Sequence, residues 1–199
     1  MTRIAGILLA AGRGTRFGGD KLLAPLPDGA LKMPAGTAVG VTAASHLASA
    51  LPDSIAVVRV GDGALSDALR RAGLRIVECA SADEGMGRSL ASGVIATSGA
   101  RGWVVALADM PWIAPATIRA VADALDAGAS IVAPTYRGTR GHPVGFAPRH
   151  VAALCALEGD EGARSIITAH PDELTLLDVD DAGIARDVDR PVDLRTRRA

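Results

Sequence analysis

The sequence predicts a single α/β domain in which helices cover both faces of a mostly parallel sheet. Its 199 residues are enough for one domain with a substantial core, and 49% of them are hydrophobic. Short apolar runs alternate along the chain with stretches of helical periodicity. This alternation is typical of parallel strands joined by helices, which pack on the two faces of the sheet.

The predicted strands are short, apolar and rich in β-branched residues. They span residues 4–10, 55–60, 74–78, 103–107, 130–133, 143–147 and 174–179. The predicted helices span residues 37–51, 65–72, 90–97, 115–125, 149–157 and 161–169. Pro115 stands at the first turn of its helix, where proline is tolerated. The later part of the chain is less regular, so we expect one or two antiparallel strands there.

Charge and cysteine content exclude several classes of protein. The formal net charge of −1 gives no basis for binding nucleic acid or an anionic membrane. The apolar runs are too short for a signal peptide or a membrane span, so a cytoplasmic protein is expected. Cys79 and Cys155 lack the spacing of a zinc site and are expected to be small core residues.

A glycine-rich segment follows the first predicted strand. Its small residues allow backbone N–H groups to approach an anion, while Arg16 and Lys21 add the cations that triphosphate sites use. It lacks the Gly-Lys-Ser/Thr of a Walker A loop, and the third glycine of a GxGxxG motif would fall on Phe17. A plain glycine-rich connection is the alternative, but the whole string favours phosphate binding. The predicted phosphate and nucleotide contacts here are Leu9, Ala10, Ala11, Gly12, Arg13, Gly14 and Lys21.

This segment resembles the signature LAAGxSxRxGxxK of nucleotidyltransferases that build sugar nucleotides and molybdenum cofactor dinucleotides. Further segments resemble the molybdenum cofactor cytidylyltransferase branch, and the similarity covers nearly the whole chain. These segments are residues 84–90, 107–111, 136–144, 159–164 and 187–194. The resemblance implies a Rossmann-like three-layer α/β sandwich, formed by one NTP-transferase domain over residues 1–199. That fold agrees with the alternation of strands and helices.

Asp109 follows a buried strand, where ligands of open α/β sheets bind. A carboxylate there suits Mg²⁺, which takes one or two carboxylates together with substrate phosphates. The alternative is an aspartate that caps a turn before Pro111. The resemblance implies the metal role for Asp109, and it implies that one acid of a late motif completes the site.

In this late motif Asp187 and Asp189 alternate with Val188, so both carboxylates face one side of an extended segment, and Asp189 is favoured as the second metal ligand. Asp178, Asp180 and Asp181 are expected to form only an exposed acidic edge.

Two further loops carry predicted contacts. In residues 85–90, free N–H groups and the Ser89 hydroxyl are predicted to bind the nucleotide through Gly87 and Ser89, although the segment also fits a simple helix start. The family usually has an asparagine shortly upstream, where this chain has Cys79. Arg140 and His142, beside Arg137 and together with Arg164, are predicted to hold the acceptor. For His142 alone, a structural role is the alternative.

The reaction implied is transfer of CMP from CTP to the phosphate of molybdenum-loaded molybdopterin, with Arg16, Lys21 and Asp109 as catalytic residues and Mg²⁺ as cofactor. A molybdoenzyme that receives the product cofactor is an expected partner. One alternative is a guanylyl or uridylyl transferase that acts on another phosphorylated small molecule. A second is a non-catalytic nucleotide sensor or cofactor chaperone. The chain departs from the family pattern at residues 27–36, at the mouth of the expected site.

Overall fold

The computed structural model describes residues 3–14, 16–27 and 33–194. Thr15 of the glycine-rich segment and residues 28–32 of the departure from the family pattern lie outside the described residues. The strands form one mixed sheet in the order β3-β2-β1-β4-β7-β5-β6, with β8 paired to β5. Their bounds are β1 (Ala5–Leu9), β2 (Ile55–Arg59), β3 (Arg75–Cys79), β4 (Trp103–Leu107), β5 (Ile131–Tyr136), β6 (Thr139–Arg140), β7 (Val144–Phe146) and β8 (Leu174–Asp178).

Most strand pairs are parallel, as predicted. β1 runs parallel to β2 and β4, β2 to β3, and β5 to β8. β7 lies antiparallel between β4 and β5, and β6 is antiparallel to β5. The antiparallel strands expected in the later part of the chain are therefore present, within an α/β fold of the predicted kind.

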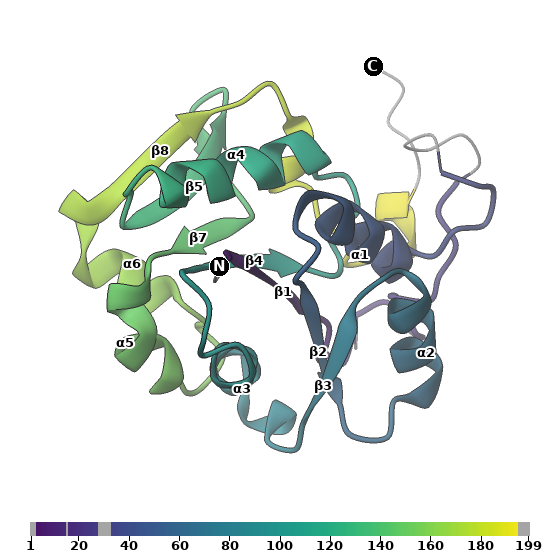
Figure 1. Ribbon diagram of the computed structural model, residues 1–199. Helices are drawn as coiled ribbons and strands as arrows, with labels where there is room; N and C mark the ends of the chain where they lie inside the picture. Colours follow the sequence, from purple (N-terminus) through teal and green to yellow (C-terminus); the bar gives the residue numbers. More distant parts are fainter. Residues whose placement is uncertain (1–2, 15, 28–32, 195–199) are drawn as a thin grey trace.

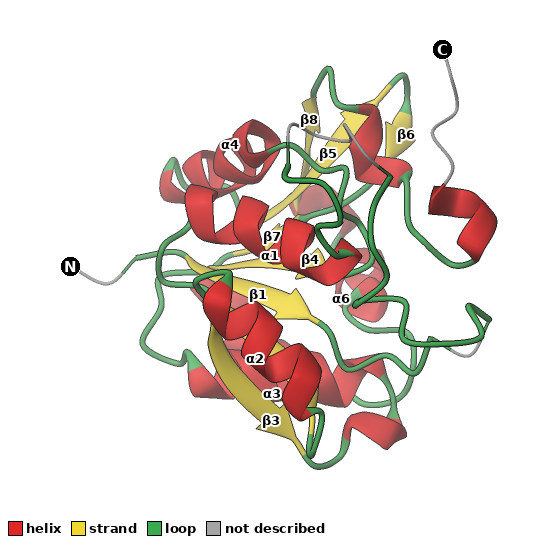
Figure 2. Ribbon diagram, turned by 90° about the vertical axis from the view of Figure 1, so that its right-hand side faces the viewer, coloured by secondary structure: helices red, strands yellow, loops and turns green. Residues whose placement is uncertain are grey.

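Helices cover both faces of the sheet (Figures 1 and 2). One face carries α1 (Val39–Ala50), α2 (Gly63–Arg71) and α4 (Pro115–Asp126), and the other carries α3 (Met86–Ala96), α5 (Val151–Cys155) and α6 (Arg164–Ala169). The alternation of side chains along β1 produces these two cores. Leu8 packs with the first group of helices and Ile7 with the second, and both are fully buried. No helix among the described residues is long and apolar enough to cross a membrane.

Several element boundaries differ from the sequence prediction. The two-residue strand β6 was not expected, because its residues lie in a segment interpreted as a loop. α3 begins at Met86, earlier than the predicted start at residue 90, and the short 3₁₀ helix Ala82–Glu84 precedes it. The predicted helix over residues 149–157 is divided into a 3₁₀ turn, Pro148–His150, and the short α5.

The acidic run near residue 180 is not simply an exposed edge. The Asp181 carboxylate accepts hydrogen bonds from the Ala114 N–H at 2.9 Å and the Thr117 hydroxyl at 2.6 Å. It therefore caps the start of α4, where Ala114 has no side chain that can do so. The expectation was wrong for Asp181 because its partners lie more than sixty residues away in sequence. Asp178 and Asp180 are exposed, as expected.

The carboxyl ends of the parallel strands β1 to β4 meet at one edge of the sheet. In Figure 2 the arrow of β1 points toward the side where long loops gather. The glycine-rich segment follows β1, Arg59 ends β2, the 3₁₀ helix Ala82–Glu84 follows β3 and Asp109 follows β4. The topology thus brings these segments to the edge where open α/β sheets bind their ligands.

Candidate active site

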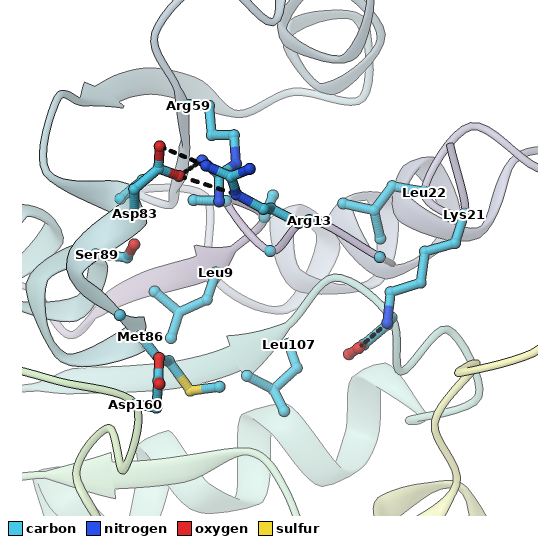
Figure 3. A pocket seen from close by; sticks show the side chains of 17 residues that line it. Leu9, Arg13, Lys21, Leu22, Arg59, Asp83, Met86, Ser89, Leu107 and Asp160 are labelled. Atoms are coloured by element: carbon cyan, nitrogen blue, oxygen red, sulfur yellow. Dashed lines mark hydrogen bonds and ion pairs between the residues drawn. The ribbon is translucent and has the colours of Figure 1, made fainter. Parts of the chain in front are cut away.

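A pocket of about 380 Å³ lies at this carboxyl edge (Figure 3). Each predicted nucleotide-binding residue except Gly87 lines it. The side chains of Leu9 and Leu107, from the ends of β1 and β4, give it an apolar surface. Charged side chains stand at both ends, so the pocket suits a ligand with a flat apolar part and an anionic tail.

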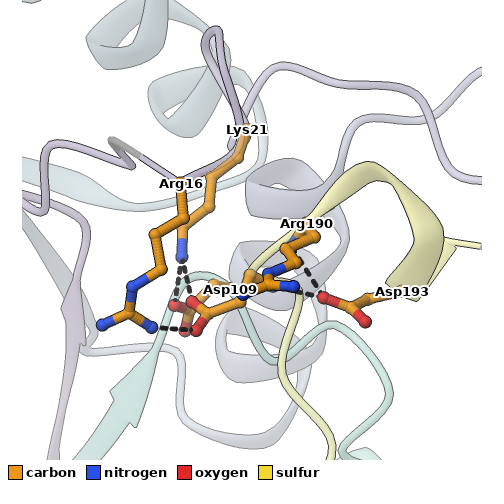
Figure 4. A network of polar contacts seen from close by, with 6 residues as sticks. Arg16, Lys21, Asp109, Arg190 and Asp193 are labelled. Atoms are coloured by element: carbon orange, nitrogen blue, oxygen red, sulfur yellow. Dashed lines mark hydrogen bonds and ion pairs between the residues drawn. The ribbon is translucent and has the colours of Figure 1, made fainter.

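Lys21 is the centre of a charged network at one end of the pocket (Figure 4). Its ammonium nitrogen lies 2.7 Å from Oδ2 of Asp109 and 3.5 Å from Oδ1 of Asp189. Arg16 contacts the other oxygen of Asp189, Oδ2, at 2.5 Å. The Lys21 side chain is only 12% exposed, whereas that of Arg16 is 71% exposed. Four charged residues predicted from separate motifs thus converge on one point.

Backbone hydrogen bonds hold the two carboxylates together. The Val188 N–H donates to the carbonyl oxygen of Asp109 at 2.9 Å, and the Val188 side chain is fully buried. The Asp193 carboxylate accepts from the N–H groups of Asp189 and Arg190 at 3.0 and 2.6 Å. This turn fixes the late acidic segment beside the loop after β4, so Asp189 faces Asp109 across the ammonium group of Lys21.

The Asp109 and Asp189 carboxylates suit a hard divalent cation that also binds a substrate. Their oxygens already share one cationic partner, Lys21, and hence point to a common position. Residues 3–14, 16–27 and 33–194 contain no cluster of three or more His, Cys, Asp or Glu that could hold a metal alone. Mg²⁺ fits such a site, because it takes one or two carboxylates and completes its shell with phosphates and water.

Asp187 lies near the same group of charges but is exposed. Burial, followed by the negative charges of Asp189 and Asp109, raises the pKa of Asp187 above its ordinary value. The contacts with Lys21 and Arg16 are made by Asp189. The choice of Asp189 over Asp187 as the second metal ligand stays a prediction.

The expected free N–H group of Gly87 is already used within the fold. It donates to the carbonyl oxygen of Gly159 at 2.8 Å, and Gly87 does not line the pocket. A β-carbon on Gly87 would lie 2.6 Å from the carbonyl oxygen of Glu158. Gly87 therefore lets the start of α3 pack closely against the loop before α6. This corrects the prediction, whereas Ser89 does line the pocket.

A second cavity, of about 360 Å³, adjoins the first and shares Leu9, Met86 and Leu107 with it. Arg140, His142 and Arg164 line this cavity, and its remaining surface includes Val144 and Phe146. The fold thus brings Arg140, at the end of β6, and the nearby His142 together with Arg164, the first residue of α6. Arg137 is not among them, because its guanidinium lies over the Tyr136 ring at 5.1 Å.

His142 presents a half-buried imidazole with a buried Nδ1 at this cavity. Its Nδ1 has no hydrogen-bond partner among the described residues, and its backbone N–H donates to Ile184. Burial lowers the pKa of His142, although the nearby Asp109 charge acts in the opposite direction. The imidazole is therefore neutral at pH 7. A β-carbon on Gly141 would lie 2.1 Å from the Ile184 carbonyl oxygen, so only glycine fits before His142.

Three charged residues that line the nucleotide pocket were not predicted from the sequence: Asp160, and the pair formed by Arg59 and Asp83. Arg59 pairs with Asp83, which also pairs with Arg13. The signal for Arg59 and Asp83 was present, because both residues stand at or just after the carboxyl end of a predicted strand.

Cys79, at the position of the family's asparagine, is buried and contacts the hydroxyls of Ser92 and Ser81 at 3.3 and 3.6 Å. Its thiol does not line the pocket.

Comparison with known proteins gives one family for most of the chain. The family described as "MobA-like NTP transferase domain" matches residues 6–174. The purine catabolism protein PucB of Bacillus subtilis (strain 168) is 28% identical over 201 residues, which cover 94% of this chain and 92% of that protein.

Solved structures show the same relationship. Rv0371c from Mycobacterium tuberculosis H37Rv superimposes with a TM-score of 0.80 at 28% identity, over 96% of this chain and 95% of that chain. A complex of the same protein with manganese gives a TM-score of 0.76, over 96% of both chains. The matched chains therefore share the whole architecture that builds the two cavities described above.

Proposed function

We propose that this chain, which belongs to the MobA-like NTP transferase domain family, transfers CMP from CTP to the phosphate of molybdenum-loaded molybdopterin. The products are molybdopterin cytosine dinucleotide and pyrophosphate. One observation carries the proposal: Arg16, Lys21, Asp109 and Asp189 converge at the end of a pocket that the glycine-rich segment lines. The nucleotidyltransferase family supplies the reaction type, and the proposal adds the two substrates.

The first cavity accounts for the nucleotide. Residues 11–14 line this cavity, and their backbone N–H groups would hold the phosphates, with positive charge from Arg16 and Lys21 beside them. Leu9 and Leu107 offer an apolar surface to the nucleoside. Ala11 is buried at the pocket wall, where its methyl group leaves less room for a purine than glycine would. This restriction favours a pyrimidine base.

The chemistry requires positioning and charge neutralisation. An oxygen of the acceptor phosphate attacks the α-phosphorus of CTP and forms a new P–O bond. The bond from the α-phosphorus to the oxygen that bridges it to the β-phosphorus breaks, and pyrophosphate leaves with that electron pair. The acceptor phosphate is already ionised at neutral pH, so no general base is needed. Lys21 and Arg16 offset the charge that grows on the leaving group.

Asp109 and Asp189 would hold the magnesium ion of the reaction. When bound, Mg²⁺ supplies Lewis-acid neutralisation of the phosphate oxygens. The ammonium group of Lys21 lies between these two carboxylates. The manganese complex of the relative Rv0371c supports a divalent ion in this family.

The second cavity supports the acceptor assignment. It combines apolar walls with Arg140, Arg164 and the neutral His142, a combination that suits a flat heterocycle carrying a phosphate. It shares Leu9, Met86 and Leu107 with the first cavity, so an acceptor phosphate bound there would lie next to the nucleotide.

The direct experiment is a substrate screen with purified protein. Each of four NTPs is mixed with Mg²⁺ and with molybdenum-loaded molybdopterin or a panel of other phosphorylated acceptors. Pyrophosphate release and the mass of the product are both measured. We expect release only with CTP and the pterin together, and a product heavier than the pterin by one CMP unit. Efficient transfer to another acceptor, or from GTP or UTP, would support a different transferase. Nucleotide binding with no transfer at all would indicate a sensor or a chaperone.

A further inference from the structure

The nucleotide pocket has a second charged end, remote from Lys21 and Asp109 (Figure 3). Arg13, Arg59 and Asp83 meet there, beside Ser89. If the phosphates lie at the Lys21 end, as proposed above, the base must lie at this end. The polar groups at this end therefore face the edge of the base.

Two arginine side chains contact Asp83 at this position. Arg13 contacts both of its carboxylate oxygens, with Nε 3.2 Å from Oδ1 and Nη2 2.7 Å from Oδ2. Arg59 contacts Oδ1 as well. Two guanidinium groups, one from the loop after β1 and one from the last residue of β2, thus contact a carboxylate that follows β3. A polar group fixed in advance loses little entropy when it binds a ligand.

Other polar groups are less suited to contact the base. The Cys79 thiol is buried among serine hydroxyls outside the pocket. Asp160 lines the pocket but lies on its opposite wall, beside Met86, and is shared with the second cavity. Asp83 is the carboxylate that two cations orient at the base end. Next to it, the buried Nε of Arg59 has no hydrogen-bond partner among the described residues.

We propose that Asp83, positioned by Arg13 and Arg59, selects a base that carries an exocyclic amino group and rejects uracil. This inference rests on the proposed transferase function and names a residue that determines its nucleotide specificity. An ionised carboxylate only accepts hydrogen bonds, so it pairs with the N4 amino group of cytosine. Uracil instead presents a carbonyl oxygen where the carboxylate requires a donor.

Selectivity of this type is strong, because the disfavoured ligand leaves polar groups unpaired. Sites that hydrogen-bond a donor on the ligand reject analogues that lack it far better than apolar pockets reject an extra methyl group. Asp83 and Ala11 would therefore exclude different bases. Ala11 limits the size of the base, and Asp83 requires a hydrogen-bond donor on the edge of the base. Together they would leave cytosine as the favoured base.

The test compares the dissociation constants of CTP and UTP, which differ only at this edge of the base. Binding is measured by calorimetry with Mg²⁺ and without acceptor, for the wild-type protein, Asp83→Asn and Asp62→Asn. We expect the wild-type protein to bind CTP at least about tenfold more tightly than UTP. In Asp83→Asn this ratio should fall to about one, because an amide can both donate and accept.

Asp62→Asn is the matched control. Asp62 lines a neighbouring cavity together with Arg13 and Arg59 but does not line the nucleotide pocket. Its carboxylate caps α2, and asparagine caps a helix about equally well. This variant should keep the wild-type ratio. It also removes one negative charge near the same arginines, so it controls for a general electrostatic effect.

The outcomes separate the two proposals. If the wild-type protein binds neither nucleotide, the transferase proposal fails, and the inference fails with it. If the wild-type protein prefers CTP but Asp83→Asn weakens both nucleotides equally, Asp83 only braces the pocket and the transferase proposal stands. A wild-type protein that binds UTP as tightly as CTP would also overturn the role of Asp83.

Discussion

Lys21 lies where three charges of the site meet, with its ammonium group between the carboxylates of Asp109 and Asp189. In the proposed reaction it must neutralise charge that grows as pyrophosphate leaves. The Lys21–Asp109 pair could be anticipated from the sequence, because a glycine-rich segment and an aspartate each follow a strand of a parallel sheet. The hydrogen bond from Val188 to Asp109, which brings Asp189 beside them, depends on tertiary packing and has no local signal.

Lys21→Ala should lower kcat by about a hundredfold or more, the usual effect of removing one electrostatic stabiliser of a transition state. The apparent KM for CTP should change much less, because the charge that Lys21 offsets develops mainly in the transition state. Steady-state pyrophosphate release measures both constants. Arg70→Ala is a suitable control, because Arg70 forms an exposed pair with Asp67 on α2. A Lys21 variant with an altered KM and normal kcat would show that this residue only binds.

His142→Ala should raise the apparent KM for the acceptor and leave the dissociation constant of CTP unchanged. The reason is its position, since His142 lines the second cavity and is absent from the nucleotide pocket. Kinetics with varied acceptor and calorimetry with CTP give the two readouts. Weakened CTP binding in a folded variant would place the His142 loop on the nucleotide instead.

Ala11→Gly should narrow the preference for CTP over GTP. The methyl group of Ala11 lies at the pocket wall, and we expect wild-type protein to favour CTP over GTP by about tenfold or more, on the scale of about 1.4 kcal/mol. Removal of the methyl group gives a purine more room. Competition of the two nucleotides for product formation measures the ratio. Equal use of CTP and GTP by the wild-type protein would contradict this role.

At the scale of elements, the start of α4 shows how far local sequence signals reach. Pro115 predicts the beginning of this helix correctly. The group that caps it is Asp181, from the 3₁₀ turn after β8, which only the folded chain brings close. Gly87 shows the same limit, because its N–H partner comes from the loop at Gly159. Elements with a clear apolar period were predicted, whereas their long-range polar partners were not.

Asp181→Ala should lower the free energy of unfolding by about 1 kcal/mol or more, because it leaves the Ala114 N–H and the Thr117 hydroxyl without their acceptor. Urea denaturation measures the change. Asp180→Ala, one residue away and exposed, is the control and should stay within about 0.5 kcal/mol of wild type. Equal stability of the two variants would show that the cap contributes little.

At the scale of the whole molecule, the sequence predicted the mixed sheet and its two helical layers because strand and helix periods are distinct. The sequence did not show that the stability of the fold depends on pH through histidines with lowered pKa values. Burial is the main cause that lowers the pKa of His46, His142 and His150 below 6.5. The unfolded chain therefore takes up protons at a higher pH than the folded protein does.

Stability should be fully present well above the pKa of about 6.5 of a histidine in the unfolded chain, and it should be lower at pH 5.5 than at pH 7.5, because protonation then favours the unfolded chain. The His150→Gln variant removes one of these groups and can still contact Ser130, the hydrogen-bond partner of the His150 ring. Urea denaturation of both proteins at the two pH values gives the comparison. We expect the free energy of unfolding to fall less in the variant than in the wild-type protein. An equal fall in both proteins would show that His150 does not contribute to the pH dependence.

The central claim is that the carboxylate of Asp109 binds the metal ion of a nucleotidyl transfer, and Asp109→Asn tests it most directly. The substitution keeps the size of the side chain and its capacity to accept a turn hydrogen bond, but it removes the charge that Mg²⁺ requires. Pyrophosphate release from CTP in the presence of acceptor is measured at limiting Mg²⁺, with circular dichroism to check the fold. We predict that turnover falls by about a hundredfold or more in a folded protein, with partial recovery at high Mg²⁺. Wild-type turnover in the folded variant at limiting Mg²⁺ would contradict the metal assignment and the mechanism built on it.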